Sequence, residues 1–370
     1  MVGRTRYTLP LSPSLERKFD ALEQELDVRV LASRERGSNG RDPRFRLVDA
    51  LPGLDGPAFY ALLPFRVARE LRARQPDAVL VQGAQETALV LLGRTLARVP
   101  ARVIADLHGD PGAPTRLYGS RTRRLLAPLA DRLGRTAVRR ADGVRTLSPF
   151  TTELVRREGV EPAAEFPAFM DLDTFLERPP APQPTDPVAL FVGVLERYKA
   201  VEVLAEAWRL AAARVPAARL RLVGRGTMRE VAEGLVIEFP GRVTWRESLT
   251  TPQVAAAMDE ATALVLPSRS EGLPRIVVEA FCRGRAVVGA RAGGIPDIVE
   301  DGVNGLLVAP GDAAALADAL ARVLSDGALA GRLGQGARET ADGWLASPEE
   351  YARRVRDLVE VGCASRSSSS

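Results

Sequence analysis

The stretch RPPAPQPTDPVALFVG, residues 178–193, divides the chain into two halves with the same pattern. Its first part, residues 178–187, is dense in proline and breaks all hydrophobic periodicity, as an interdomain linker does. Its second part, residues 188–193, is a short apolar run that ends in glycine, which is typical of a buried strand. The stretch therefore predicts a boundary between two domains and the first strand of the second.

On both sides of this boundary, short apolar runs alternate with amphipathic helical stretches. Such alternation is typical of parallel sheets that carry helices on both faces. We expect an α/β protein with two Rossmann-like domains facing a cleft, residues 1–178 and 188–340, and ligands at the carboxyl ends of the strands. The expected strands are residues 27–33, 45–50, 78–83, 102–109 and 143–148 in the first domain, and 188–193, 219–224, 242–247, 263–268, 286–290 and 305–310 in the second.

The two ends of the chain give further expectations. A helix over residues 347–360, capped by Ser347 with Glu350 three residues on, is expected to complete the first domain, and the tail 361–370 to be disordered. At the other end, GRTRY reads as a loop that begins after only two residues. The first domain is therefore expected to lack its usual first strand, so that the sheet has a gap or a much shortened strand at its centre.

The charge and cysteine content exclude several classes of protein. Lysine and arginine number 51 against 47 acidic residues in a chain of 370, a net charge of +4, which is too small for general nucleic-acid binding unless it is concentrated somewhere. Cys282 and Cys363 cannot by themselves form a disulfide framework or a metal site. Without a signal peptide or an apolar run of about 18 to 20 residues, a cytoplasmic chain that does not span a membrane is expected.

The segment SRSEGLPRIVVEA, residues 268–280, carries two glutamates around a Gly-Leu-Pro turn. A helix is expected to begin near Pro274, so the free backbone N–H groups of residues 273 to 276 and the positive helix end would form an anion site suited to a diphosphate. Glu271 lies before the turn and Glu279 within the helix, so the two carboxylates can flank one bound anion. The alternative is an acid favoured by the helix dipole and a second on a solvated face.

Together with RAGGIPDIVEDGVNGLLVAPGD (291–312), this segment resembles the carboxyl-terminal domain of retaining GT-B glycosyltransferases of family four, which carry a glutamate pair with seven residues between them. The resemblance implies transfer of a sugar from a nucleotide-diphosphate sugar to an acceptor with retention of configuration, without a metal ion or a cofactor. It extends over residues 144–160, 166–175, 191–208 and 220–227.

The resemblance also implies roles for single residues. Glu279 resembles the residue that holds the donor ribose hydroxyls, and Glu271 the one that contacts the transferred sugar. Lys199 matches the lysine that neutralises the diphosphate, and Gly193 the glycine that lets the strand end approach it. His108 resembles the first-domain histidine that faces the transferred sugar.

One position departs from the family pattern. Val194 stands where family members commonly carry an arginine, and Arg197, three residues on, is the candidate to replace that charge. The acceptor is expected beside Gly3 and Arg4 of the GRTRY loop. The remaining expected donor contacts are the turn and the first helical residues, Gly272, Leu273, Pro274, Arg275 and Ile276.

Several of these residues have a plainer interpretation. His108 at a strand end can be a hydrogen-bonded structural residue, and Lys199 a surface lysine, although the chain has only one other lysine, Lys18. Asp171 and Asp173 have the spacing of a metal-binding Asp-x-Asp motif, but they fall in a turn and are interpreted as structural.

Residues 116–140 form the one strong charge cluster, with eight arginines and a single acid, Asp131. Leucines at helical spacing make the segment amphipathic, a pattern that can lie on an anionic membrane surface. The alternative is a solvated arginine face.

Three other functions compete with glycosyl transfer. A sugar-nucleotide epimerase on the same fold would need acid and base groups around the sugar. A non-catalytic sugar-nucleotide-binding protein is compatible with Val194 and the short amino terminus. Nucleic-acid binding through residues 116–140 would be strongly salt-dependent, and is not expected at this net charge.

Overall fold

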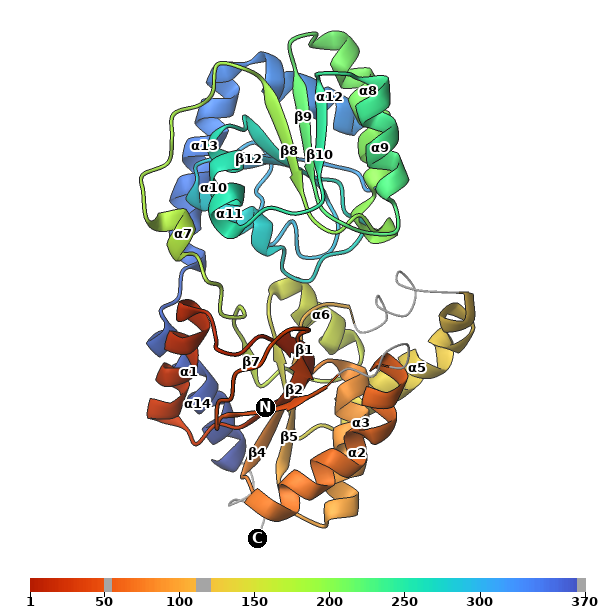
Figure 1. Ribbon diagram of the computed structural model, residues 1–370, viewed down its shortest axis with the longest axis vertical. Helices are drawn as coiled ribbons and strands as arrows, with labels where there is room; N and C mark the ends of the chain where they lie inside the picture. The colour runs from red at the N-terminus through yellow and green to blue at the C-terminus, as the bar shows by residue number, and fades with distance from the viewer. Residues whose placement is uncertain (50–54, 111–120, 365–370) are drawn as a thin grey trace. The chain divides into compact units, whose positions relative to one another are not determined.

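The computed structural model describes residues 1–49, 55–110 and 121–364, and the side chains of these except at 55, 121–127 and 361–364. The chain divides into two compact units (Figure 1). Unit 1 comprises Met1–Phe169 and Ala346–Ser370, and unit 2 comprises Met170–Leu345. The chain therefore enters unit 2 ahead of the proline-dense stretch 178–187 rather than within it.

Unit 1 is built on a seven-stranded sheet whose strands are all parallel, in the order β3-β2-β1-β4-β5-β6-β7. The strand order reverses between β1 and β4, which makes their carboxyl ends the switch point of the sheet. The strands are β1 (Val2–Tyr7), β2 (Val30–Arg34), β3 (Phe45–Val48), β4 (Ala78–Gln82), β5 (Arg102–Leu107), β6 (Gly143–Thr146) and β7 (Ala164–Glu165).

The helices of unit 1 lie on both faces of this sheet because successive strand residues point to opposite sides. In β4, Leu80 belongs to the core under α1 and α14, whereas Val79 and Val81 belong to the core under α2 and α3. Figure 1 shows α1 and α14 together on one side and α2, α3 and α5 on the other. The helices are α1 (Pro13–Glu25), α2 (Asp55–Arg74), α3 (Ala84–Ala97), α5 (Arg121–Arg140), α6 (Pro149–Arg157) and α14 (Pro348–Ala364).

The prediction that unit 1 lacks its first strand is wrong. Val2–Tyr7 forms β1 at the centre of the sheet and pairs with β2 and β4. Only Val2 and Gly3 are buried in it, because Val2 is opposite Val81 and the rest of β1 extends past the end of β4. A strand whose later residues leave the core needs no apolar run, so GRTRY was misread as a loop.

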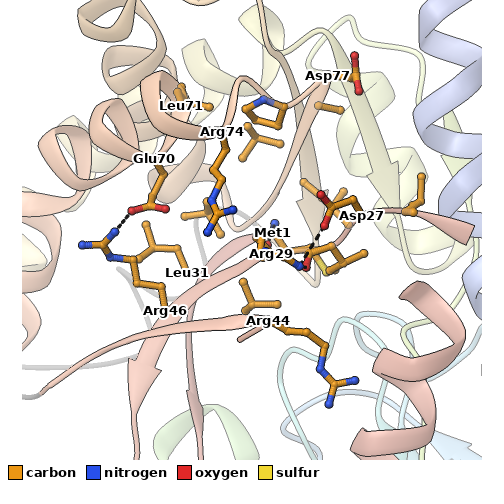
Figure 2. A pocket seen from close by; sticks show the side chains of 18 of the residues that line it. Met1, Asp27, Arg29, Leu31, Arg44, Arg46, Glu70, Leu71, Arg74 and Asp77 are labelled. Atoms are coloured by element: carbon orange, nitrogen blue, oxygen red, sulfur yellow. Dashed lines mark hydrogen bonds and ion pairs between the residues drawn. The ribbon is translucent and has the colours of Figure 1, made fainter. Parts of the chain in front are cut away.

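A gap is nevertheless present at the amino end of β1. The register between β1 and β4 consists of the single pair Val2 and Val81, so Ala78, Val79 and Leu80 have no partner in β1. A cavity of about 560 Å³ opens here, lined by Met1, Val30 and Leu80 among others (Figure 2). The Met1 amine lies at this cavity and donates to Arg29 O at 2.6 Å.

Unit 2 repeats the same architecture with six parallel strands in the order β10-β9-β8-β11-β12-β13. The order reverses between β8 and β11, which pair directly. Every strand predicted from an apolar run is present in the two sheets. The strands of unit 2 are β8 (Val188–Val192), β9 (Arg219–Val223), β10 (Val243–Arg246), β11 (Ala263–Leu266), β12 (Ala286–Ala290) and β13 (Gly305–Val308).

Two cores hold the helices of unit 2 against this sheet. Trp208 is fully buried in the core beneath α8, α9 and α12, and Phe281 in the core beneath α7, α10 and α11, while α13 contributes to both. The elements are α7 (Asp173–Leu176), η1 (Arg197–Lys199), α8 (Val201–Arg214), α9 (Arg229–Glu238), α10 (Thr251–Asp259), α11 (Arg275–Cys282), α12 (Ala313–Ser325), α13 (Gly327–Ala341) and η2 (Asp342–Trp344).

The proline-dense stretch is fastened to unit 2 by two buried arginines. Arg283 donates to the carbonyls of Arg178 at 2.7 Å and Pro179 at 3.1 Å, and Arg285 donates to that of Ala181 at 2.9 Å. Proline cannot donate a backbone hydrogen bond, but its carbonyl accepts one. The stretch is therefore held along unit 2 by its carbonyls. Among the described residues, no helix is both long and apolar enough to cross a bilayer.

Candidate active site

Two loops of unit 2 meet at its switch point. β8 and β11 are paired neighbours, so the loop after Val192 and the loop after Leu266 leave the sheet side by side at its carboxyl edge. This is where an open α/β sheet binds its ligand. Arg269 connects the two loops, because its N–H donates to Tyr198 O at 2.7 Å and its guanidinium donates to Arg197 O at 2.8 Å.

Lys199 and Glu271 form the central ion pair of this site. Lys199 Nζ donates to Glu271 Oε1 at 2.6 Å, and the two side chains are only 10% and 11% exposed. Lys199 also lies beside Gly193, where an added Cβ would be 3.5 Å from Lys199 Cε. That distance is an ordinary contact, so packing against the lysine alone would not exclude alanine at position 193.

Gly293, to which no role was assigned from the sequence, holds Glu271 in place. Its φ is +57°, and a Cβ there would lie 2.2 Å from Glu271 O, so a side chain is excluded by backbone. The next residue, Gly294, donates its N–H to the same carbonyl at 2.9 Å. The RAGG segment was part of the family resemblance, and this close approach explains its paired glycines.

The start of α11 lies in the same loop. The N-cap position is Pro274, no side chain caps the helix, and its first turn contains no acid. The positive end of the helix dipole is therefore not offset by an acid of its own first turn. One part of the prediction needs correction: Pro274 has no N–H, so the donors expected in residues 273 to 276 are those of Leu273, Arg275 and Ile276.

Glu279 lies one turn into α11 and is 14% exposed. Burial raises the pKa of its carboxyl above the ordinary value, Asp171 raises it further, and Arg275 opposes both. The only ion pair recorded for it in the described residues is a long one, with Arg275 Nη2 at 3.6 Å. A buried carboxylate with so little compensation is suited to accept hydrogen bonds from ligand hydroxyls.

The loop after β8 also holds Val194, which departs from the family pattern, and Arg197, the candidate to replace the missing charge. Val194 is 45% exposed directly after Gly193. Arg197 is exposed, and no ion pair of its guanidinium is recorded within the described chain. Arg197 is therefore sterically free to reach an anion, whereas Lys199 is already held in the site.

Asp171 and Asp173 form a local turn at the start of α7. Asp171 Oδ1 accepts a long hydrogen bond, 3.4 Å, from the backbone N–H of Asp173, the first residue of α7. Over residues 1–49, 55–110 and 121–364, no group of three or more His, Cys, Asp or Glu side chains is arranged to hold a metal ion.

His108 lies in unit 1, directly after β5, and its ring is 43% exposed. Its Nε2 lies 3.0 Å from Asp106 Oδ2, and the other oxygen of Asp106 accepts from Arg145 Nη1 at 2.8 Å. Burial would raise the pKa of Asp106, but Arg145 and His108 outweigh it and the pKa lies below its ordinary value. Asp106 is thus an anchored carboxylate that orients the histidine ring.

Sequence reasoning missed both residues under His108. Arg145 is fully buried, its guanidinium lies 4.0 Å from the ring centre of Phe166, and it donates to Pro167 O at 2.7 Å. The signal was present, since Asp106 and Arg145 are charged residues inside the apolar runs RVIADLHG and GVRTLS. A buried charge in a parallel strand needs a partner, and adjacent strands provide one.

Gly3 and Arg4 were predicted in an acceptor loop, and this is wrong because both are part of β1. Gly3 passes Gln82, where an added Cβ would lie 2.7 Å from Gln82 Oε1. The Arg4 guanidinium lies 5.6 Å from the ring centre of Tyr60, whose hydroxyl donates to Glu86 at 2.7 Å. These side chains gather at the switch point of unit 1.

Comparison with known proteins identifies the family. The profile described as "Glycosyl transferases group 1" matches residues 186–326, and that of the "Glycosyl transferase 4-like domain" matches residues 11–166. D-inositol 3-phosphate glycosyltransferase of Frankia alni is 31% identical over 285 residues, which are 72% of this chain and 67% of the relative. The chain belongs to the group 1 glycosyltransferases. In four other curated relatives, the match spans between 35% and 55% of the relative's own length.

Solved structures show that this group 1 glycosyltransferase has the GT-B fold, as predicted. Sucrose-phosphate synthase from Thermosynechococcus elongatus matches with a TM-score of 0.75 and 22% identity, over 95% of this chain and 93% of that one. Anabaena Alr3699/HepE, solved in complex with UDP and glucose, matches with a TM-score of 0.69 and 18% identity, over 97% and 98%. At such identities the likeness concerns the fold alone.

Proposed function

We propose that this group 1 glycosyltransferase moves a hexosyl group from a nucleotide-diphosphate sugar to an acceptor hydroxyl, with retention of anomeric configuration and without a metal ion. The observation that carries the proposal is the Lys199–Glu271 pair, 2.6 Å long and nine-tenths buried, at the switch point of unit 2 beside the start of α11. A lysine and a helix start in one loop region form a site for a diphosphate. The adjoining carboxylates supply acceptors for sugar hydroxyls.

The donor would bind across these groups in a definite order. Lys199 and the N–H groups at the start of α11 would hold the diphosphate, where negative charge develops as the sugar leaves. Glu279, whose pKa is raised by burial, would accept hydrogen bonds from the ribose hydroxyls. Glu271 would exchange its bond to Lys199 for hydroxyls of the transferred sugar.

The transfer itself would use the leaving group as the base. The bond between the anomeric carbon and the β-phosphate oxygen breaks, and its electron pair stays on that oxygen. The acceptor hydroxyl forms the new bond to the anomeric carbon on the same face and gives its proton to the departing diphosphate. In this scheme the protein contributes positioning and electrostatic stabilisation rather than a nucleophile.

The donor base and sugar are open to direct test. HepE, with the same fold, was solved with UDP and glucose, so uridine diphosphate sugars stand first in a thermal-shift panel that also contains guanosine and adenosine diphosphate sugars. A donor at one hundred times its dissociation constant should stabilise the chain by about 2.7 kcal/mol. We expect donors with one base to raise the unfolding temperature, and Lys199→Ala to reduce that shift.

Product analysis separates the proposal from its rivals. A transferase should release nucleoside diphosphate slowly with water and faster with a suitable acceptor. Binding without any release would identify a sugar-nucleotide-binding protein, and a changed sugar still joined to its nucleotide would identify an epimerase. Stabilisation by none of the donors would contradict the proposed site. The attachment to an anionic membrane that was predicted for residues 116–140 is independent of this transfer; residues 116–120 lie outside the described residues, and the rest form α5 of unit 1.

A further inference from the structure

Three neighbouring helices of unit 1 present an unusual outer surface. α3 packs between α2 and α5 on one face of the sheet (Figure 1). The approach is close on both sides, because a Cβ at Gly93 would lie 2.8 Å from Pro64 O of α2 and one at Gly134 would lie 3.2 Å from Ala84 Cβ. The solvent sides of the three helices therefore form one continuous surface, called here the outer helical face.

Exposed apolar side chains are concentrated on this face. Six of the eleven large apolar side chains that are exposed in the described chain lie on these three helices. Phe65 is 65% exposed and shares a shallow groove with Leu96 of the neighbouring helix. Single exposed apolar residues are ordinary, but a cluster marks an interaction surface. The six are Leu62, Phe65, Leu92, Leu96, Leu129 and Leu133.

Among the described residues, the exposed charges of the outer helical face that lack an ion pair are positive. Arg69, Arg132 and Arg140 are exposed, and no ion pair is recorded for them in the described residues. The described acids of the same helices do not compensate them, because Glu86 and Asp131 are buried and Glu70 is half-buried against Arg46. The surface therefore combines apolar anchors with uncompensated positive charge.

The structure divides the arginine cluster predicted from the sequence into arginines that are bound to unit 1 and arginines that face solvent. Arg139 donates to Glu158 O at 2.9 Å and pairs with its carboxylate at 2.8 Å, so it is tied to unit 1 itself. In contrast, Leu129, Arg132, Leu133 and Arg140 follow helical spacing along the exposed side of α5. The surface that is available to a partner is thus one stripe of α5 together with α2 and α3.

We propose that the outer helical face is a docking surface for an anionic lipid bilayer. Exposed leucine and phenylalanine insert into the interfacial region, and arginines contact the lipid phosphates. Each arginine near an anionic leaflet contributes about 1 kcal/mol, which corresponds to about a fivefold change in affinity. Both contributions are needed, because charge alone would attract any polyanion.

The test measures sedimentation of the full chain with vesicles of phosphatidylcholine that contain phosphatidylglycerol, and with phosphatidylcholine alone. We expect binding to the anionic vesicles only, weakened by salt. Phe65→Ser with Leu133→Ser should reduce the affinity about tenfold. Arg69→Gln, Arg132→Gln and Arg140→Gln together should reduce it about a hundredfold. All these positions are exposed, so the variants should melt like the parent chain.

Matched controls come from unit 2. Leu210→Ser with Ile237→Ser removes exposed apolar side chains, and Arg214→Gln, Arg229→Gln and Arg322→Gln remove the same number of charges. These variants should bind vesicles like the parent. Loss of binding in the controls, or unchanged binding in the Phe65 and Leu133 variant, would overturn the proposal. Two other results would also overturn the proposal. One is a dimer that forms without lipid and that the variants of the outer helical face dissociate. The other is tight binding to duplex DNA that these variants abolish.

Discussion

Lys199 and Glu271 are 72 positions apart in the chain, yet their side chains form a 2.6 Å ion pair that is about nine-tenths buried. The pair joins η1, after β8, to the loop after β11. It keeps a cation in the site before any ligand is present, and the carboxylate compensates the charge of that buried cation. A diphosphate that takes over the lysine would release Glu271 to a sugar hydroxyl.

Lys199→Ala is expected to lower the turnover rate about a hundredfold or more, as the loss of one preorganised charge stabiliser does. Lys199→Arg should recover only part of it, because the guanidinium is broader and donates in a fixed fork. Arg197→Ala tests whether this exposed neighbour shares the role, and it should cost less than Lys199→Ala because Lys199 is already held in the site. The reverse result, with Lys199→Ala active and Arg197→Ala inactive, would show that the wrong cation was assigned.

Glu279→Gln is expected to stabilise the chain without ligand and to weaken donor binding. Because burial raises the folded-state pKa of Glu279, its stabilising contribution is present below the unfolded value of 4.5 and is lost as the pH rises through the folded value. At neutral pH the ionised group therefore costs stability, which glutamine relieves.

Urea denaturation at pH 7 and at acid pH measures the first effect, and donor titration the second. The unfolding midpoint should rise at pH 7 only, and donor affinity should fall about tenfold or more, the contribution of a charged hydrogen bond. Glu206→Gln, at an exposed position of α8, should change neither quantity. A donor affinity unchanged by Glu279→Gln would remove this residue from the site.

Arg145→Ala is expected to destabilise unit 1 by about 3 to 5 kcal/mol, because it leaves Asp106 buried without its cation. The pKa of Asp106 lies below its ordinary value, so its contribution is present above the unfolded value of 3.8 and is lost as the pH falls through the folded value. The variant should therefore lose less stability on acidification than the parent chain. Arg157→Ala, in an exposed pair with Glu153, should cost less than about 1 kcal/mol. Equal urea midpoints for the two variants would contradict this account.

In the 370-residue chain that is tested, the Met1 amine should make the free energy of unfolding depend on pH near neutrality. Burial lowers its pKa from 8.0 to about 6 in the folded chain. Between these values the unfolded chain binds more protons, so the free energy of unfolding should rise with pH across this window, by about 2 to 3 kcal/mol in all. Acetylation of Met1 should abolish that rise. A pH profile that acetylation leaves unchanged would show that the amine is solvated.

The cavity at the amino end of β1 gives a related expectation. Four strand-forming residues joined ahead of Met1 can pair with β2 and β4 and fill a cavity of about 560 Å³. We expect a higher urea midpoint than acetylation alone gives, since apolar surface is buried as well as a charge removed. A Gly-Ser extension of equal length is the control. The same midpoint for both extensions would show that the cavity does not accept a strand.

Local patterns in the sequence were enough to predict the GT-B fold and the family. Every apolar run quoted as a strand is a strand, because strands covered by helices on both faces are mostly apolar. The motif around Glu271 and Glu279 was equally local, and it led to the group 1 glycosyltransferases. The roles assigned to Lys199, Glu271, Glu279 and His108 stay predictions.

Only the tertiary structure decided which distant residues meet. β1 has almost no apolar signal, and it is a strand because β2 and β4 offer it backbone partners. Asp106 and Arg145 are paired because β5 and β6 are adjacent in register. The sequence shows the two glycines of the RAGG segment, but only the fold brings Gly293 against the backbone of Glu271 and lets Gly294 donate to its carbonyl. Periodicity along a chain reports how each residue is buried, but partners of buried charges are set by sheet order and register, which exist only once the chain has folded.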